Sequence, residues 1–304
     1  MLRSGLVGAV VAGLWLCGCG GDGGGSAGDG GRAGDGGGGP SDASTLADAG
    51  PVGDAALAED AALGPRIFIH VAATAATFPH SDGLSGQTPR LHRNGIRSFQ
   101  LLRNMGDPQP LHVFDHGDGF VEASYDDGAD TVVGSARAAS LTAGTYTVGR
   151  VVLSHVRYQV DSTLHAGGFD IPGRYDNVQV LSERTTLDGT ARARGWFRYV
   201  FTGGASSYPL EGVGGAPVPT GPTGSSLVTA LEGGELALYF PVQLVVNPAV
   251  TSDVHEVIEF NVDQCFRWQD QTQAGYQPAV FDSTPSGYEP VLRFGANSFR
   301  VFQR

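Results

Sequence analysis

Three arginines and one tryptophan alternate along a predicted strand over residues 190–202. Its even positions carry Arg192, Arg194, Trp196 and Arg198, and alternate residues of a strand lie ~6.6–6.8 Å apart on one face. Guanidinium groups beside an indole ring can bind a carboxylate, a phosphate or an anionic sugar, with stacking on the ring. These four are therefore candidate ligand-binding residues. The alternative, favoured by the excess of acids, is a solvated face whose arginines pair with nearby carboxylates and whose tryptophan is covered by a loop.

A second candidate is a set of aspartates in two glycine-containing segments, 115–119 and 126–130. The set consists of Asp115, Asp118, Asp126, Asp127 and Asp130. Clustered carboxylates can hold calcium, which accepts many oxygen ligands in flexible geometry. The spacing does not match the EF-hand loop, because no Glu stands at that loop's last position. Asp and Gly are also the ordinary residues of hairpin turns, so the alternative is turn formation without a metal.

Several other chemistries are excluded by composition or by incomplete motifs. The 19 basic residues are all arginine, so a phosphate-loop lysine and Schiff-base catalysis are ruled out. The net charge of -12 argues against nucleic acid as a partner. No G-x-S-x-G motif occurs, and His255-Glu256 begins a zinc-protease motif that lacks its second histidine. We expect no catalysis and no cofactor except calcium. A paired-carboxylate enzyme acting on carbohydrate remains an alternative.

Short runs rich in Val, Ile, Phe, Tyr and Thr alternate with Gly, Pro, Asn and Asp from about residue 66 onward. This pattern predicts strands and turns, and the fold class it favours is all-β, an antiparallel β-sandwich. The predicted strands are 67–71, 96–102, 111–114, 119–124, 145–160, 177–182, 190–202, 235–246, 254–268, 277–281 and 290–302. Residues 226–233 are compatible with a helical turn or two. The Gly/Pro-rich stretch 203–225 is predicted to be a long surface loop, and the alternative is a boundary between two smaller sandwiches.

Two predicted strands show a face pattern. In 145–160 the even residues from Tyr146 to Val160 form the more apolar face. In 254–268 Cys265 falls on the polar face, with Asp263 and Arg267. Because the Asp263 carboxylate opposes thiolate formation, we expect Cys265 to be an inert thiol covered by a neighbouring loop.

The segment before the strand at 145–160 reads Leu141-Thr-Ala-Gly-Thr-Tyr146. It resembles the L-x-A-G-x-Y entry turn of secreted sandwich domains, which are immunoglobulin-like or prealbumin-like in fold. The resemblance covers six residues and occurs in proteins of unrelated function, so it supports the fold class and implies no activity.

The amino terminus has the features of a secretory signal peptide, residues 1–18. A positive start with Arg3 precedes an apolar run from Leu6 to Leu16 that is too short to span a bilayer. The following Leu-Cys-Gly-Cys19 resembles the bacterial lipoprotein box, which implies lipidation of Cys19. Gly20 after that cysteine implies sorting to the outer membrane of a Gram-negative bacterium.

Residues 19–64 form the lipidated cysteine and a linker rich in Gly, Asp and Ala. Glycine is costly to order and little here can be buried, so we expect a disordered tether with an end-to-end distance of roughly 35–40 Å. The β-sandwich domain is then 65–304. Taken together, the sequence predicts a lipid-anchored envelope protein acting as a non-catalytic binding or structural module with a glycan or protein ligand. Its alternatives are a calcium- or metal-binding envelope lipoprotein and a carbohydrate-active enzyme.

Overall fold

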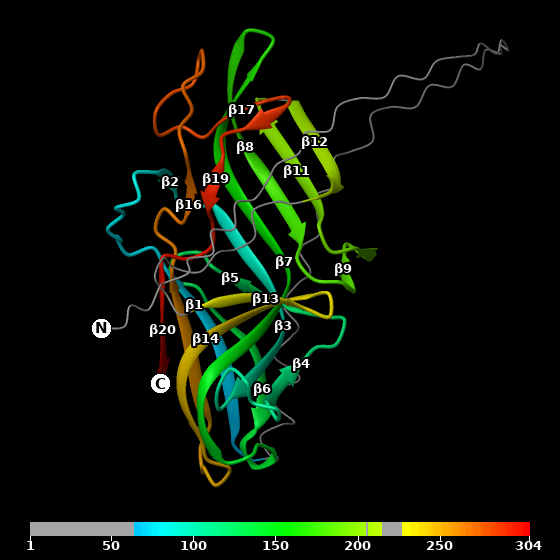
Figure 1. Ribbon diagram of the computed structural model, residues 1–304, viewed down its shortest axis with the longest axis vertical. Helices are drawn as coiled ribbons and strands as arrows, with labels where there is room; N and C mark the ends of the chain where they lie inside the picture. Colours follow the sequence, from blue (N-terminus) through cyan, green and yellow to red (C-terminus); the bar gives the residue numbers. More distant parts are fainter. Residues whose placement is uncertain (1–63, 205, 215–226) are drawn as a thin grey trace, which may run out of the picture. The chain divides into compact units, whose positions relative to one another are not determined.

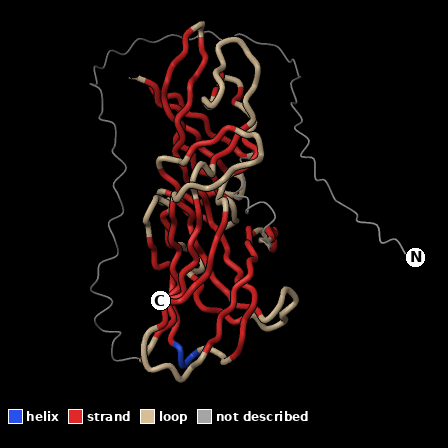
Figure 2. The backbone as a smooth tube through the Cα atoms, turned by 90° about the vertical axis from the view of Figure 1, so that its left-hand side faces the viewer, coloured by secondary structure: helices blue, strands red, loops and turns tan. Residues whose placement is uncertain are grey.

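The computed structural model describes residues 64–204, 206–214 and 227–304. The predicted signal peptide, Cys19 and almost all of the linker lie outside these residues. Within them nearly all regular structure is strand, and the one helical segment is the 3-10 turn η3 (Ala138–Ser140) (Figure 2). No helix of this part of the chain is long and apolar enough to cross a bilayer.

The largest sheet is organised around β7 (Gly144–Ala166), a strand of 23 residues (Figure 1). One edge of β7 pairs first with β14 and then with β8, and the other edge pairs with β3 and then with β17. The remaining bounds in this sheet are β3 (Leu91–Leu102), β4 (Leu111–Asp115), β5 (Val121–Ser124), β8 (Phe169–Val180), β11 (Trp196–Gly203), β12 (Ser206–Val213), β13 (Val228–Glu232), β14 (Glu235–Val246), β17 (Asp282–Thr284) and β18 (Gly287–Tyr288).

A four-stranded sheet covers the half of the large sheet where β7 begins. Its strands, in spatial order, are β20 (Ser298–Gln303), β15 (Val254–Asn261), β1 (Arg66–Thr74) and β6 (Asp130–Arg137). Ile69 of β1 and Ile258 of β15 face Phe99 of β3 and Phe240 of β14 in one hydrophobic core. β-Branched and aromatic side chains suit such a half-buried pleated surface, and the two layers form a sandwich.

A three-stranded sheet covers the other half of the large sheet. It consists of β19 (Val291–Arg293), β16 (Phe266–Trp268) and β2 (Ser85–Gln87). Phe266 packs against Tyr158 of β7 and against Phe281, with ring centroids 5.7 and 5.0 Å apart. These side chains belong to the same core cluster as the first sandwich. A separate two-stranded sheet contains β9 (Thr185–Leu187) and β10 (Thr190–Arg192).

The all-β, sandwich-like fold predicted from the sequence is therefore present, and the described residues belong to one compact unit. Most strand pairs are antiparallel, as expected. Two are parallel, β1 with β15 and β7 with β17. Parallel neighbours require a long crossover connection. Such a connection joins segments far apart in the sequence, so local patterns do not predict it.

The predicted entry turn closes through a hydrogen bond. The hydroxyl of Tyr146, which is fully buried, donates to the carbonyl oxygen of Thr142 over 2.9 Å. Gly144 lies beneath the ring, where an added Cβ would contact it at 3.6 Å. This tyrosine fixes the point at which the chain enters β7.

The strand at 235–246 is reproduced to the residue by β14, whereas other segments differ from the prediction. Residues 228–232 form strand β13 rather than a helical turn, and 206–213 form strand β12 inside the expected loop. The segment 277–281 is not a strand, and pairing begins only at Asp282. Both β12 and β13 are outer strands of the large sheet, and nearly all of their described side chains are exposed, so their apolar pattern is weak.

The alternation predicted for 145–160 changes phase inside β7. Val156 and Tyr158 face the main core as expected, but at the middle of the strand Leu153 does so, whereas Val152 joins a cluster on the opposite face. The pairing of β3 with β7 shifts register on both sides of Ile96. Such bulges move side chains to the other face, so strict alternation was wrong at this point.

Candidate functional site

The arginine–tryptophan row does not lie on one strand. The chain breaks between β10, which ends at Arg192, and β11, which begins at Trp196. Gly195 has φ 86° in this break, a left-handed conformation that glycine adopts without strain. Trp196 consequently turns inward and is 8% exposed, whereas Arg194 and Arg198 remain exposed. The prediction of one continuous strand carrying these four side chains in a row is wrong.

Arg192 and Trp196 instead form a closed unit with Glu211. The guanidinium of Arg192 lies over the indole, 4.0 Å from the ring centroid, and its Nη1 is 3.3 Å from Glu211 Oε1. Trp196 Nε1 donates to the same oxygen over 2.9 Å, and the ring packs with Val180 and Leu187. The contacts of these two residues match the alternative interpretation of a paired arginine and a covered tryptophan.

The five aspartates of the candidate calcium site have separate partners. Asp115 accepts a hydrogen bond from the Gly117 N–H over 2.8 Å, and Asp127 accepts one from Ala75 N–H over 2.7 Å. The other three are in ion pairs with arginines: Asp118 with Arg184, Asp126 with Arg93, and Asp130 with Arg304, and Asp130 also makes a hydrogen bond with His70. Within the described residues, no group of three or more His, Cys, Asp or Glu side chains is arranged to hold a metal ion. Calcium binding by these residues stays a prediction.

A serine, a histidine and a glutamate lie in line near the middle of β7. Ser154 Oγ is 3.0 Å from His155 Nδ1, and His155 Nε2 is 2.9 Å from Glu122 Oε1. This order resembles a nucleophilic triad, but Ser154 is fully buried and its hydroxyl also lies 3.1 Å from the Gly95 carbonyl. No substrate carbonyl can reach the hydroxyl in this arrangement.

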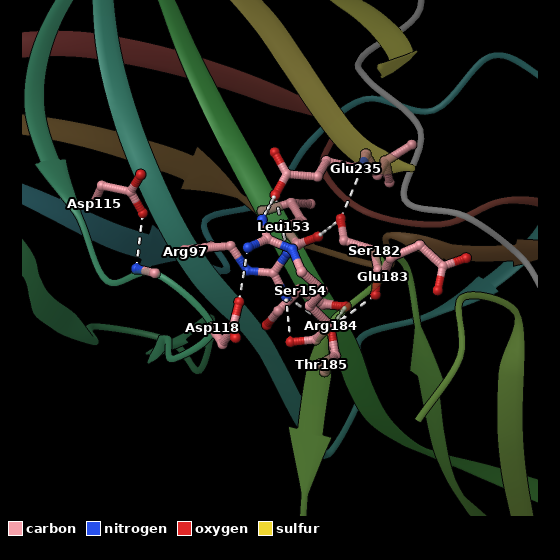
Figure 3. Close-up of polar contacts among 12 residues, drawn as sticks. Arg97, Asp115, Asp118, Leu153, Ser154, Ser182, Glu183, Arg184, Thr185 and Glu235 are labelled. Carbon is pink, nitrogen blue, oxygen red and sulfur yellow. Dashed lines mark hydrogen bonds and ion pairs between the residues drawn. The ribbon is translucent and has the colours of Figure 1, made fainter. Parts of the chain in front are cut away.

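The same region holds a network of polar side chains around Arg97 (Figure 3). Arg97 is 1% exposed; its Nη2 donates to Thr185 Oγ1 over 3.0 Å, and its Nη1 lies 3.2 Å from Glu235 Oε1. Ser182 Oγ donates to the Leu153 carbonyl and accepts the Leu236 N–H. Since buried polar groups are costly unless bonded, this network ties β3, β7 and β14 to the turn at 182–185.

A cleft of about 420 Å³ lies between the loop at 75–84 and the sheet formed by β16 and β19. Its polar and aromatic lining includes Phe78, His80, Asp82, Arg267, Arg293 and Asn297. Cavities of this size hold small organic ligands. By contrast, the cavity between the two layers of the main core measures about 50 Å³ and is almost entirely apolar, which is room for a few water molecules.

Two arginines and one aspartate set the charge of the cleft. Arg267 donates to both oxygens of Asp82, from Nη2 over 2.5 Å and from Nε over 3.0 Å, and is 3% exposed. Arg293 Nη1 lies 3.7 Å from the same carboxylate. Burial alone would raise the pKa of Asp82, but the bonds from Arg267 and the nearby positive charges hold it below its usual value. One carboxylate therefore faces two cations.

Cys265 lies at the wall of this cleft and not on the polar face of a strand. The predicted strand 254–268 is broken between β15 and β16, and Gln264 in the break has φ 45°. Cys265 is 3% exposed, and burial raises the pKa of its thiol to about 12. The thiol therefore stays protonated at neutral pH, in keeping with the expected inert cysteine.

No protein-family model matches the chain, and no curated protein or solved structure is significantly similar to it.

Sequence reasoning did not single out the residues of the cleft. Arg267 was expected on the polar face of a strand, yet it is buried, as are its chain neighbours Phe266 and Trp268. The one local sign that Arg267 has a buried partner is its position between Phe266 and Trp268, in an otherwise apolar run. The partner, Asp82, is 185 residues away in the chain, and nothing in either local pattern connects the two.

Proposed function

We propose that this chain is a lipid-anchored protein of the bacterial cell envelope that acts as a non-catalytic binding module, with the cleft at Arg293 as its ligand site. The observation that carries the proposal is the charge arrangement of the cleft, in which two guanidinium groups share the Asp82 carboxylate. The second guanidinium is left to attract an anion from solution.

The amino-terminal sequence supports the anchoring part of the proposal. The apolar run, the box ending at Cys19 and the glycine-rich linker together are typical of exported lipoproteins. A flexible linker lets an anchored domain search the space around its attachment point, which raises the effective concentration of the domain near surface ligands.

The chemistry of the cleft favours recognition over catalysis. Asp82 is held ionised by Arg267, and Cys265 stays protonated because it is buried. His80 Nε2 lies 3.2 Å from the Asp263 carbonyl oxygen, to which it donates. A buried, protonated thiol is not an active nucleophile, and the Asp82 carboxylate and His80 Nε2 already make hydrogen bonds within the protein. The cleft therefore suits hydrogen bonding and charge pairing with a bound molecule.

The binding site is tested with the full chain in an uncharged detergent, by thermal unfolding in increasing sodium acetate at constant ionic strength. We expect acetate to raise the melting temperature of the wild type through ligand linkage, and to have no such effect on Arg293→Gln. The matched control is Arg300→Gln, because Arg300 also pairs with one carboxylate, Glu259, but lies on β20 outside the cleft. Equal responses of all three proteins would contradict the proposal.

Anchoring is tested separately in a Gram-negative host fed with an alkyne-tagged fatty acid. The wild-type chain should acquire the label and partition into the membrane fraction. Cys19→Ala should lose the label, whereas Cys265→Ala should keep it because Cys265 is buried. A Cys19→Ala protein that is labelled like the wild type would refute lipidation at this residue.

A further inference from the structure

Arg267 and Arg293 are direct cross-strand partners in the pairing of β16 with β19. Like charges at directly opposite positions of an antiparallel pair repel each other. Asp82 lies between them from the loop on the far side of the cleft and offsets one of the two charges. Counting these three side chains, the cleft carries one uncompensated positive charge.

The two guanidinium groups are not equivalent. Arg267 donates from Nε and Nη2 to Asp82, and from Nη2 to the Leu84 carbonyl over 2.5 Å. Arg293 has a side chain that is 41% exposed, and its separation of 3.7 Å from Asp82 is an ion pair without a hydrogen bond. Its planar fork of donors is therefore available to a second carboxylate, for which it has the matching geometry.

The charge count distinguishes between classes of anion. When a monoanion pairs with Arg293, the charges of the three side chains and the ligand sum to zero. A dianion such as a phosphate monoester would leave an excess negative charge beside Asp82, and two like charges at such short range repel each other strongly where water is partly excluded. The cleft is therefore suited to a carboxylate.

The remaining walls of the cleft have both apolar and polar parts. Phe78 supplies aromatic surface, while His80, Ser81 and Asn297 supply hydrogen-bonding groups. A sugar ring has the same division, with C–H faces that stack on aromatic rings and hydroxyl groups at its edge. The cleft volume of about 420 Å³ leaves room for a ring beside the carboxylate group.

On these grounds, and resting on the proposed function above, we propose that the cleft binds a uronic acid unit, with the sugar carboxylate on Arg293 and the ring against Phe78. The carboxylate accepts hydrogen bonds from the Arg293 guanidinium, and the ring hydroxyls reach His80 and Asn297. The ligand class is thus an acidic polysaccharide or a free sugar acid that presents such a unit.

The experiment is isothermal titration of the full chain in a polyoxyethylene detergent, which contains no sugar. The matched probes are methyl glucuronide and methyl galacturonide against methyl glucoside and methyl galactoside, which differ in a carboxylate replacing a hydroxymethyl group. Glucose 6-phosphate supplies a dianionic sugar and benzoate a carboxylate on a ring without hydroxyls. Arg293→Gln, Arg293→Lys and the control Arg300→Gln are titrated in parallel, and their melting temperatures establish that each variant is folded.

We expect at least one uronide to bind, with the neutral glycosides weaker by at least about tenfold because the charged hydrogen bonds are lost. Arg293→Gln should lose this preference, Arg293→Lys should retain part of it, and Arg300→Gln should behave as the wild type. Neutral glycosides that bind as well as uronides would overturn the assignment. Arg293-dependent binding of glucose 6-phosphate or benzoate alone would overturn the uronic acid assignment and leave the proposed anion site standing. If no probe binds in an Arg293-dependent way, both proposals fail.

Discussion

The imidazole rings of His70 and His255 meet end to end, with His70 Nε2 2.8 Å from His255 Nδ1. The residues belong to the parallel neighbours β1 and β15, and their ring centroids are 5.1 Å apart. Asp130 contacts the other nitrogen of His70 at 2.8 Å. The arrangement is a chain of hydrogen bonds across the outer face of the four-stranded sheet, in which one ring nitrogen must donate and the other accept.

Because His70 and His255 are joined by a hydrogen bond, we expect the effects of substituting them on the free energy of unfolding to be coupled. His255→Leu leaves the Nε2 of His70, a residue that is 5% exposed, without its partner, and should lower the unfolding free energy by about 1–3 kcal/mol. The double variant His70→Leu/His255→Leu removes both polar partners and should cost less than the sum of the single changes. Urea unfolding of the four proteins at pH 7 gives the cycle. Strict additivity would show that the hydrogen bond does not form.

His92 predicts acid sensitivity. It is buried, stacked 4.6 Å from Tyr125, and neither ring nitrogen has a hydrogen-bond partner within the described residues. Burial, aided by the charge of Arg93, lowers its pKa to about 3 from 6.5. The unfolded chain therefore takes up this proton first, and the stability due to neutral His92 is present above pH 6.5 and is lost as the pH falls toward 3.

His92→Phe keeps the aromatic contact and removes this titration. At pH 5 the variant should exceed the wild type in unfolding free energy by more than it does at pH 7, with an added difference on the order of 1–2 kcal/mol. Chemical unfolding at both pH values measures the change. His112→Gln, at an exposed position, is the control and should show no such pH-dependent gain. An unchanged difference between pH 5 and 7 would mean that His92 is not buried as neutral imidazole.

Glu256 is expected to have the opposite pH dependence, with stability lost as the pH rises. It is 3% exposed, its Oε2 has no partner among the described residues, and burial raises its pKa to about 7. The folded state therefore favours the protonated acid. The stability it contributes is complete below about pH 4.5 and is lost as the pH rises to 7.

Glu256→Gln should therefore raise the unfolding free energy at pH 8, by about 1–3 kcal/mol, and have little effect at pH 4.5. The control on the same strand is Glu259→Gln, which removes the ion pair with Arg300 and should give no gain at pH 8. Thermal unfolding at the two pH values decides the matter. A Glu256→Gln protein that is less stable than the wild type at pH 8 would show that the carboxylate is ionised and paired.

The sequence pattern makes Trp196 a candidate ligand contact, whereas its buried position leads us to expect an effect of its substitution on stability. Trp196→Ala should lower the unfolding free energy by about 3 kcal/mol, because it leaves a cavity beside Val180 and Leu187. Arg198→Ala, at an exposed position of the same strand, should change it by about 0.5 kcal/mol or less. Similar small effects of both changes would place the indole at the surface.

The parts of the fold that were predictable are those with a continuous local pattern. β14 was located from an apolar run, and the entry turn at Tyr146 from six residues whose hydrogen bond is internal to the segment. The breaks at Gly195 and Gln264 were missed because a single left-handed residue interrupts a strand without changing its composition. Each break separates two strands that have different partners.

The candidate site was out of reach for a different reason. Asp82 and Arg267 are adjacent only because the loop after β1 folds over β16, and Arg267 and Arg293 are opposite only in the sheet register. A register shift between Arg267 and Trp268 further changes which residues align. Such relationships depend on tertiary pairing, whereas composition and spacing report on the chain's own neighbours.

β7 is shared by the two halves of the molecule, since it pairs with β14 near its start and with β8 near its end. A continuous strand of this kind makes the halves one cooperative unit, because separating either cover sheet exposes core residues of the other. We therefore expect a ligand bound at the cleft, beside β16 and β19, to stabilise β7 against local opening along its whole length. Slower amide hydrogen exchange at Val151 and Leu153, far along β7 from the β17 pairing, would report on occupancy of the cleft without any probe placed in it.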